Sequence, residues 1–212
     1  NATKNSRIIA KTDLGEVIKS IHSGYDFLLP MVESTKHEIN ASGGTAFRGD
    51  KMVGWVSEVE LESIMLMRDI YLGGLITTII PDTNDAVATL EVQKADSKIT
   101  PIIEGDQLQF DIFIDITGTY AEENRYHSHG QLNEEFLEKL TKSFEGEIVK
   151  MCSETMKKMQ KDYEADVVQL KKIIQKREPA YWKNHGSKWE EIYPTVKIHI
   201  KANVDIVLVG LK

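Results

Sequence analysis

The segment from residue 196 to residue 206 alternates strictly between apolar and polar side chains, with Leu208 continuing its apolar face, and it constrains the fold more than any other part of the chain. One face carries Val, Ile, Ala and Leu, and the other carries Lys, His, Asn and Asp. A period of two is typical of a β-strand that has one face on a core and the other in water. We therefore expect a sheet with one covered face.

A helical period replaces this alternation between Asn133 and about Lys176. Apolar residues from Phe136 to Ile174 recur at spacings of three and four, with many Lys and Glu residues between them. Such a stripe is typical of an amphipathic helix that packs along one side. It predicts either one very long helix or two successive helices that meet near Asp162.

Two capping-box patterns predict shorter helices near residues 13–24 and 57–68. In each pattern an Asp or Ser that can cap the helix is followed three residues later by Glu. The second helix is apolar on more than one side, so we expect it to be buried. We expect the glycine pair at residues 73–74 to stop it.

The remaining regular segments read as strands. Segments 45–47 and 52–56 flank a turn that contains glycine, which predicts a β-hairpin. Four further strands are expected, separated by short turn-rich pieces, and short connections favour antiparallel pairing. Their predicted ranges are 75–80, 86–94, 98–103 and 108–117.

Together these elements predict an α+β fold, in which a mostly antiparallel sheet packs against a long amphipathic helix, or two successive helices, with shorter helices added. We expect one domain over residues 3–212. Residues 1–2 resemble the remnant of an expression tag, and residues 3–43 are alternatively the end of a preceding domain.

Composition argues against several classes of partner. The formal net charge of -7 disfavours nucleic acid, because binding to a phosphate backbone rests on clustered Lys and Arg. No run approaches the roughly 20 apolar residues of a membrane span. The single cysteine, Cys152, has no zinc-type spacing around it and lies in a helical pattern, so we expect a buried thiol that packs as a small apolar group.

Residues with catalytic or metal-binding chemistry are few. His127 and His129 would share one face of an extended segment, after Glu122 and Glu123. A zinc site needs three or four rigidly held ligands, whereas this stretch reads as a polar loop. No nucleophile elbow, phosphate-binding loop or dinucleotide fingerprint is present. We therefore predict no catalytic residues, no metal and no cofactor.

Three blocks of sequence, in this order, resemble one known family. They are residues 44–55, which read GTAFRGDKMVGW, the Tyr-Glu-Ala-Asp stretch at 163–166, and a C-terminal block over 179–210 with Pro179, Trp182 and Trp189. The pattern resembles the C-terminal domain of the C-subunit lipoproteins of spore germination nutrient receptors, the GerAC-like family. One departure is visible, because this chain lacks the glycine-containing turn that the family commonly has after residue 166.

The resemblance implies a non-catalytic lipoprotein subunit of the germinant receptor. Members of the family are anchored by a lipidated N-terminal cysteine to the outer face of the spore inner membrane. There they assemble with the integral-membrane A and B subunits to support nutrient-triggered germination. The anchor would lie upstream of this chain, so Cys152 is not that cysteine.

The residues that we predict to contact partners are chosen only because we expect them to be exposed. They are Arg48, Asp50, Lys51, His127 and His129. Two other functions remain open: a domain that binds the nutrient itself, in a pocket lined by Trp55 or Trp182, and a metal-dependent hydrolase that uses the two histidines and a nearby Glu.

Overall fold

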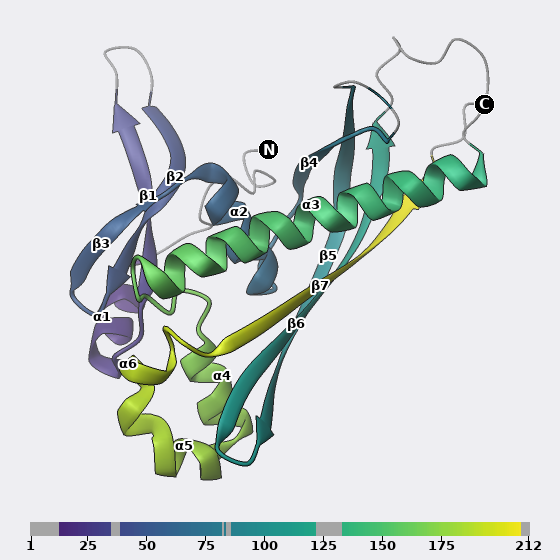
Figure 1. The fold of residues 1–212 in the computed structure, drawn as a ribbon. Coiled ribbons are helices and arrows are strands. Elements are labelled where there is room, and N and C mark those ends of the chain that lie inside the picture. Colours follow the sequence, from purple (N-terminus) through teal and green to yellow (C-terminus); the bar gives the residue numbers. More distant parts are fainter. Residues whose placement is uncertain (1–12, 35–38, 82, 84–85, 122–132, 209–212) are drawn as a thin grey trace.

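A computed structural model shows two β-sheets joined by a set of helices (Figure 1). It describes residues 13–34, 39–81, 83, 86–121 and 133–208. The α+β class predicted from the sequence is confirmed. The smaller sheet and the larger sheet both contribute to one continuous hydrophobic core.

The smaller sheet contains three antiparallel strands in the order β1-β2-β3. Their ranges are β1 Phe27–Ser34, β2 Ile39–Arg48 and β3 Lys51–Val56. The predicted hairpin is confirmed as β2 and β3, which are joined by a tight turn. Pro30 lies in the edge strand β1, next to a register shift, and an edge is where a sheet tolerates a residue with no N–H to donate.

The larger sheet contains four strands in the order β4-β5-β6-β7. Their ranges are β4 Gly74–Ile79, β5 Val87–Glu104, β6 Gln107–Ala121 and β7 Lys197–Val207. The first three strands are antiparallel, as predicted, but β7 runs parallel to β6. A parallel partner needs a long crossover, which here consists of the helices that lie between β6 and β7 in the chain.

The strand β5 and the residue Leu208 differ from the prediction for this sheet. The segments expected as separate strands, 86–94 and 98–103, form the single strand β5, which only shifts register between Val92 and Lys94. The alternation in β7 is confirmed from Lys197 to Ile206, with the apolar side chains on the less exposed face, whereas Val207 is 41% exposed. Leu208, just beyond the strand, is an exception because it is exposed.

The segment that carries the predicted apolar stripe folds as two helices, α3 (Glu134–Lys161) and α4 (Leu170–Arg177). Of the two alternatives, two successive helices are therefore correct. The chain turns between them without glycine, and Glu164 and Gln169 adopt left-handed backbone angles there (φ 47° and 66°). The missing family glycine therefore does not prevent the helix break.

Helix α1 (Leu14–Ser23) begins at Asp13 as predicted, and α2 (Glu58–Met67) begins with a complete capping box. The predicted stop of α2 at the glycine pair 73–74 is wrong. The helix ends at Met67 because Asp69 adopts a left-handed conformation (φ 60°). The Asp69 carboxylate then accepts a hydrogen bond from the backbone of β5.

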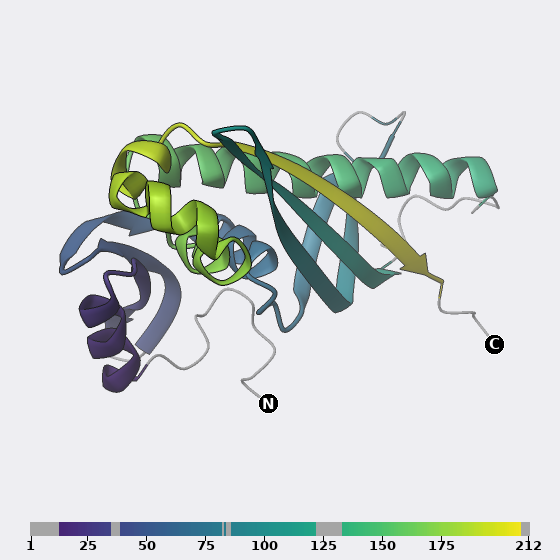
Figure 2. The same cartoon turned by 90° about the horizontal axis from the view of Figure 1, so that it is seen from below.

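The connection into β7 consists of three short helical pieces, α5 (Pro179–His185), η2 (Gly186–Lys188) and α6 (Trp189–Ile192). Figure 2 shows them beside α4, at the end of the molecule where β5 and β6 turn. Their aromatic rings pack on one another: the Trp189 ring centroid lies 5.8 Å from that of Trp182 and 6.0 Å from that of Tyr193. The C-terminal tryptophans therefore hold this connection together.

Helix α3 crosses one face of the larger sheet, and α2 is buried along nearly its whole length (Figure 1). Cys152 lies in α3 with its thiol fully buried, as predicted. Burial raises the pKa of this thiol to about 12. No helix in the described part of the chain is long and apolar enough to cross a membrane.

Candidate functional site

The tip of the β2–β3 hairpin carries three of the predicted contact residues, Arg48, Asp50 and Lys51. Gly49 forms the turn with φ 59°, and its N–H donates to the Asp26 carboxylate at 3.0 Å. Asp50 and Lys51 are exposed. We chose these residues because we expected them to be exposed, and they are. That they contact a partner protein stays a prediction.

Arg48 is already engaged within the chain. Its Nη1 atom lies 2.8 Å from Glu164 in the turn after α3, and its Nη2 atom lies 2.5 Å from Glu190 in α6. The hydrogen bond with Glu190 raises the pKa of the guanidinium. The arrangement joins the hairpin tip to two segments more than a hundred residues away in sequence, so Arg48 serves first to position the tip.

His127 and His129 lie outside the described residues, so their predicted role stays a prediction. Within the described part of the chain, no group of three or more His, Cys, Asp or Glu side chains is placed to hold a metal ion. The hydrolase alternative rests on His127 and His129, so it stays a prediction.

The most prominent surface feature is the outer face of the smaller sheet, the face turned away from the core. Cross-strand pairing forms two rows there, Phe27–Phe47–Met52 and Leu29–Thr45–Trp55. Phe27 and Thr45 are buried, and the rows become exposed toward β3. The Phe27 and Phe47 rings stack at 5.0 Å between centroids. Trp55 is 58% exposed and Met52 is 44% exposed. An exposed Trp beside an exposed Met is unusual on a surface that meets only water.

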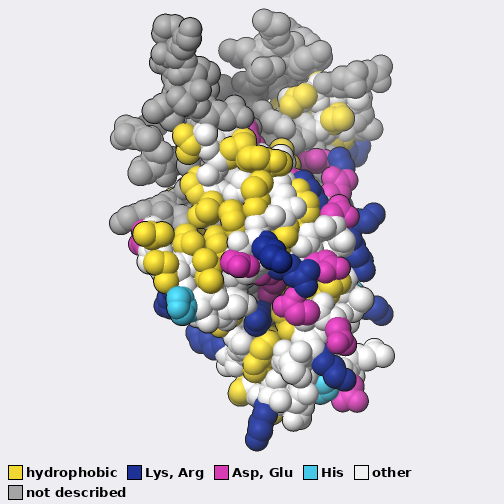
Figure 3. All heavy atoms as spheres, turned by 90° about the vertical axis from the view of Figure 1, so that its left-hand side faces the viewer, with side chains coloured by type: hydrophobic (Ala, Val, Ile, Leu, Met, Phe, Trp, Pro, Cys, Tyr) yellow, Lys and Arg dark blue, Asp and Glu magenta, His cyan; other side chains and the backbone are white. Residues whose placement is uncertain are grey.

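Helix α1 adds a second exposed apolar stripe. Leu14, Ile18 and Ile21 recur at spacings of four and three, so they share one side of the helix, and each is at least 41% exposed. No residue of α1 is buried. We call these three residues, together with Met52 and Trp55, the apolar face. Figure 3 shows hydrophobic side chains gathered on this side of the molecule, which is the left-hand side of Figure 1.

The apolar face is held in place by contacts behind Trp55. The Trp55 carbonyl accepts hydrogen bonds from the Tyr163 hydroxyl at 2.8 Å and from the Lys158 ammonium at 3.1 Å. Lys158 also pairs with Glu60 at 2.8 Å. The end of α3 and the start of α2 therefore fix the backbone of β3, and with it the position of the indole.

Buried acids lie behind the hairpin tip. The Asp166 side chain accepts hydrogen bonds from the backbone N–H groups of Leu170 and Lys171 and so caps α4. Burial raises its pKa to about 7. Asp26 accepts from the Asp166 N–H at 2.7 Å, and burial raises its pKa as well. This pair was not found from the sequence, because Asp26 and Asp166 are brought together only by the fold.

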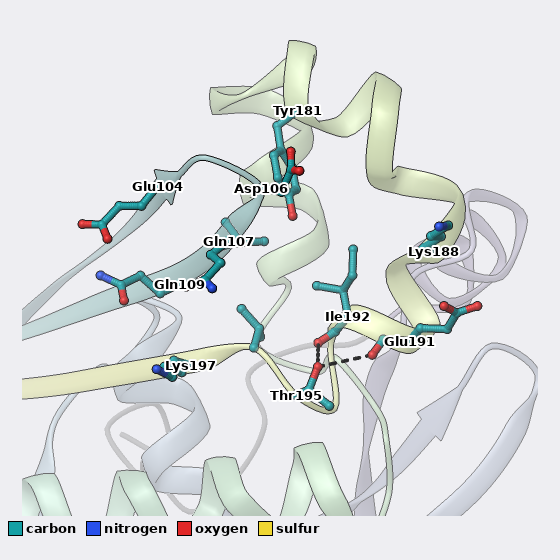
Figure 4. A pocket seen from close by; sticks show the side chains of 12 residues that line it. Glu104, Asp106, Gln107, Gln109, Tyr181, Lys188, Glu191, Ile192, Thr195 and Lys197 are labelled. Carbon is teal, nitrogen blue, oxygen red and sulfur yellow. Dashed lines mark hydrogen bonds between the residues drawn. The ribbon is translucent and has the colours of Figure 1, made fainter.

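The cavities on the described part of the chain include the following three. One of about 460 Å³ lies between the β5–β6 turn, α5 and the start of β7 (Figure 4), and its lining includes Asp106, Tyr181 and Lys197. Burial, together with the nearby Asp106, raises the pKa of Tyr181. Asp106 itself is 97% exposed, so Asp106 and Tyr181 do not form a desolvated acid–base pair.

A second cavity of about 460 Å³ lies beside the ion pair between Lys158 and Glu60. A third, of about 490 Å³, lies between α1, the end of α2 and the start of α4. Neither Trp55 nor Trp182 lines any of the three cavities. The tryptophan-lined nutrient pocket expected in the second alternative is therefore not found among them.

Comparison with known proteins assigns the chain to a family. Residues 42–210 match the family model described as spore germination B3/GerAC like, C-terminal. The match covers well over half of the chain, and the chain belongs to this family. Its members are spore germination proteins, and a spore-associated location follows for the family.

Two relatives come from Bacillus subtilis (strain 168). The chain is 29% identical over 212 residues to spore germination protein YndF, covering 99% of this chain and 52% of that protein. It is 26% identical over 208 residues to spore germination protein B3, covering 97% of this chain and 54% of that protein. The chain thus spans about half the length of these relatives.

A solved structure, described as the crystal structure of the GerBC protein, has the same fold. Its TM-score is 0.84 at 24% sequence identity, over 98% of this chain and 66% of that one. The agreement over nearly the whole chain confirms the architecture described above.

Proposed function

We propose that this chain is the C-terminal, non-catalytic domain of a germinant-receptor C subunit, and that its apolar face docks on the integral-membrane A and B subunits of the receptor. Family membership supports the receptor context. The observation that carries the proposal is the apolar face, where Trp55 and Met52 are exposed on β3 and Leu14, Ile18 and Ile21 are exposed on α1. Trp and Met are enriched where proteins meet partners.

The proposed setting is the outer face of the spore inner membrane. A lipid anchor upstream of this chain would confine the domain there, and residues 3–212 would act as one domain. Confinement raises the effective concentration of the partners, so an interface of modest size suffices. Asp50 and Lys51 extend from the hairpin next to Met52, and they would supply polar contacts at the rim of the interface, where charged residues usually lie.

The test uses spores in which the full-length parent gene lacks this domain. Response to nutrients and response to a trigger that bypasses the receptor are measured, along with the levels of the membrane subunits. We expect the nutrient response to be lost and the receptor-independent response to be normal. Depleted subunits would assign an assembly role, and intact subunits a signalling role.

Sister receptors can mask the loss, so the deletion is made in a strain that lacks the other nutrient receptors. A nutrient response that persists in that strain would refute the proposal. A matched strain carries the charge-reversing pair Asp50→Lys and Lys51→Glu in the intact gene. Because rim charges mainly affect association rates, we expect a slower response there but not an absent one.

A further inference from the structure

The cavity between α1, α2 and α4 has a size and a lining that suit a small molecule. Its volume of about 490 Å³ lies within the usual range for small-molecule sites. Apolar side chains, among them Val17, Phe27 and Leu28, form part of the wall, and the guanidinium of Arg68 forms another part. Sites for small molecules typically combine such an apolar lining with a few polar groups that fix orientation.

Arg68 is the feature that needs explanation. Burial lowers the pKa of this guanidinium, yet within the described residues no carboxylate lies within the 4.0 Å of an ion pair, and no hydrogen bond from its side chain is formed. The acids that influence it, Asp166 and Glu16, act only at longer range. Arg68 is only partly buried and lines the cavity; a partly buried cation is stabilised by a compensating anion, and the cavity is where such a partner would fit.

We propose that this cavity binds a small organic carboxylate, held by Arg68 through a bidentate pair. A guanidinium offers parallel N–H donors that match the two oxygens of a carboxylate. Lys19 and Lys172 also line the cavity and add positive charge. The apolar wall takes the hydrocarbon part of the ligand.

The acidic residues near the cavity favour a singly charged carboxylate over a phosphate as its ligand. Glu16 lines the same cavity, and Asp166 lies close enough for its charge to oppose the lowering of the Arg68 pKa by burial. A doubly charged phosphate would be repelled by both groups more strongly than a singly charged carboxylate. Tyr25 also lines the cavity, but its hydroxyl already donates to Gln175 at 2.6 Å. Arg68 is therefore left as the main anchor.

The test is isothermal titration of the chain with isovalerate, a branched carboxylate that fits the cavity. Isovaleramide, which has nearly the same shape without the charge, and inorganic phosphate are titrated in parallel. For a ligand of this size we expect a Kd of about 1–10 mM. We expect Arg68→Met to weaken isovalerate binding at least about tenfold, because a charge-assisted pair is lost. The matched control is Arg177→Met, at an exposed position, which should leave the affinity for isovalerate unchanged.

Several results would overturn the proposal. The first is that isovalerate does not bind saturably. The second is that Arg68→Met binds isovalerate as tightly as the unmodified chain, and the third is that isovaleramide binds as tightly as isovalerate. Phosphate that binds more tightly than isovalerate would refute the ligand class. If Arg68→Met does not fold, amide chemical shifts of the unmodified chain replace it. Isovalerate should then shift Ser20, Ile70 and Gln169, which line the cavity, and shifts confined to other regions would refute the site. Neither experiment depends on the role in germination.

Discussion

Replacing Gly54 by Ala tests the packing that positions Trp55. A Cβ atom at residue 54 would lie 2.2 Å from Cζ and 2.4 Å from the hydroxyl oxygen of Tyr163. Gly54 has no left-handed backbone angle, so alanine is allowed there by the backbone and only the ring opposes it. The ring would have to move, and the hydrogen bond from its hydroxyl to the Trp55 carbonyl would be lost.

The expected cost follows from these two losses. Overpacking of a filled site costs about 1–3 kcal/mol, and a lost hydrogen bond costs about 0.5–1.5 kcal/mol. Because the ring escapes the clash by the same movement that breaks the bond, the two costs partly overlap. We expect Gly54→Ala to lower the free energy of unfolding by about 2–3 kcal/mol.

A double-mutant cycle measured by urea unfolding isolates the cause. In a Tyr163→Ala background the obstructing ring is absent, so Gly54→Ala should cost less than about 0.5 kcal/mol, which gives a coupling energy near 2 kcal/mol. The control is Gly146→Ala in α3, where an added Cβ meets nothing within 4 Å. It should stabilise the fold by about 0.5–1 kcal/mol. Equal costs of Gly54→Ala in both backgrounds would refute the reasoning.

Three further predictions concern buried groups. Burial raises the pKa of Asp166 to about 7 from 3.8, so the folded state holds this proton more tightly; the associated stability is present at low pH and is lost as the pH rises through 7. Unfolding free energies should therefore fall by about 2–3 kcal/mol between pH 5 and pH 8, and Asp166→Asn should flatten this slope; an unchanged slope would contradict it. Cys152, buried with a pKa of about 12, should resist a thiol reagent until the protein unfolds, and rapid labelling of the native chain would show that α3 opens. Phe144→Ala, at a fully buried core position, should cost about 3–5 kcal/mol in urea unfolding; a cost below about 1 kcal/mol would show that the core there is not tightly packed.

Elements whose signals are local could be predicted from the sequence. The caps of α1 and α2 are formed by residues three positions apart, and the alternation in β7 is carried by β7 alone. The hairpin at Gly49 was found for the same reason.

Features that depend on distant parts of the chain could not be predicted. The parallel pairing of β7 with β6 joins segments about ninety residues apart. The end of α2 at Asp69 and the connection between α3 and α4, at Glu164 and Gln169, use non-glycine residues in left-handed conformations, and a tertiary contact between Asp69 and Ser97 helps to hold the first of them. The apolar face was missed because the spacing of hydrophobic residues shows that a helix or strand has an apolar side, but does not show whether another element covers it.

The most direct test of the docking proposal is site-specific photocrosslinking in spore membranes. A photoreactive amino acid replaces Trp55 in the full-length protein, and a matched control carries it at Lys201, an exposed position on β7 in the other sheet. The proposal predicts a crosslink from residue 55 to an integral-membrane receptor subunit and none from residue 201. A crosslink from residue 55 only to another part of the same polypeptide, or equal yields from both positions, would contradict it.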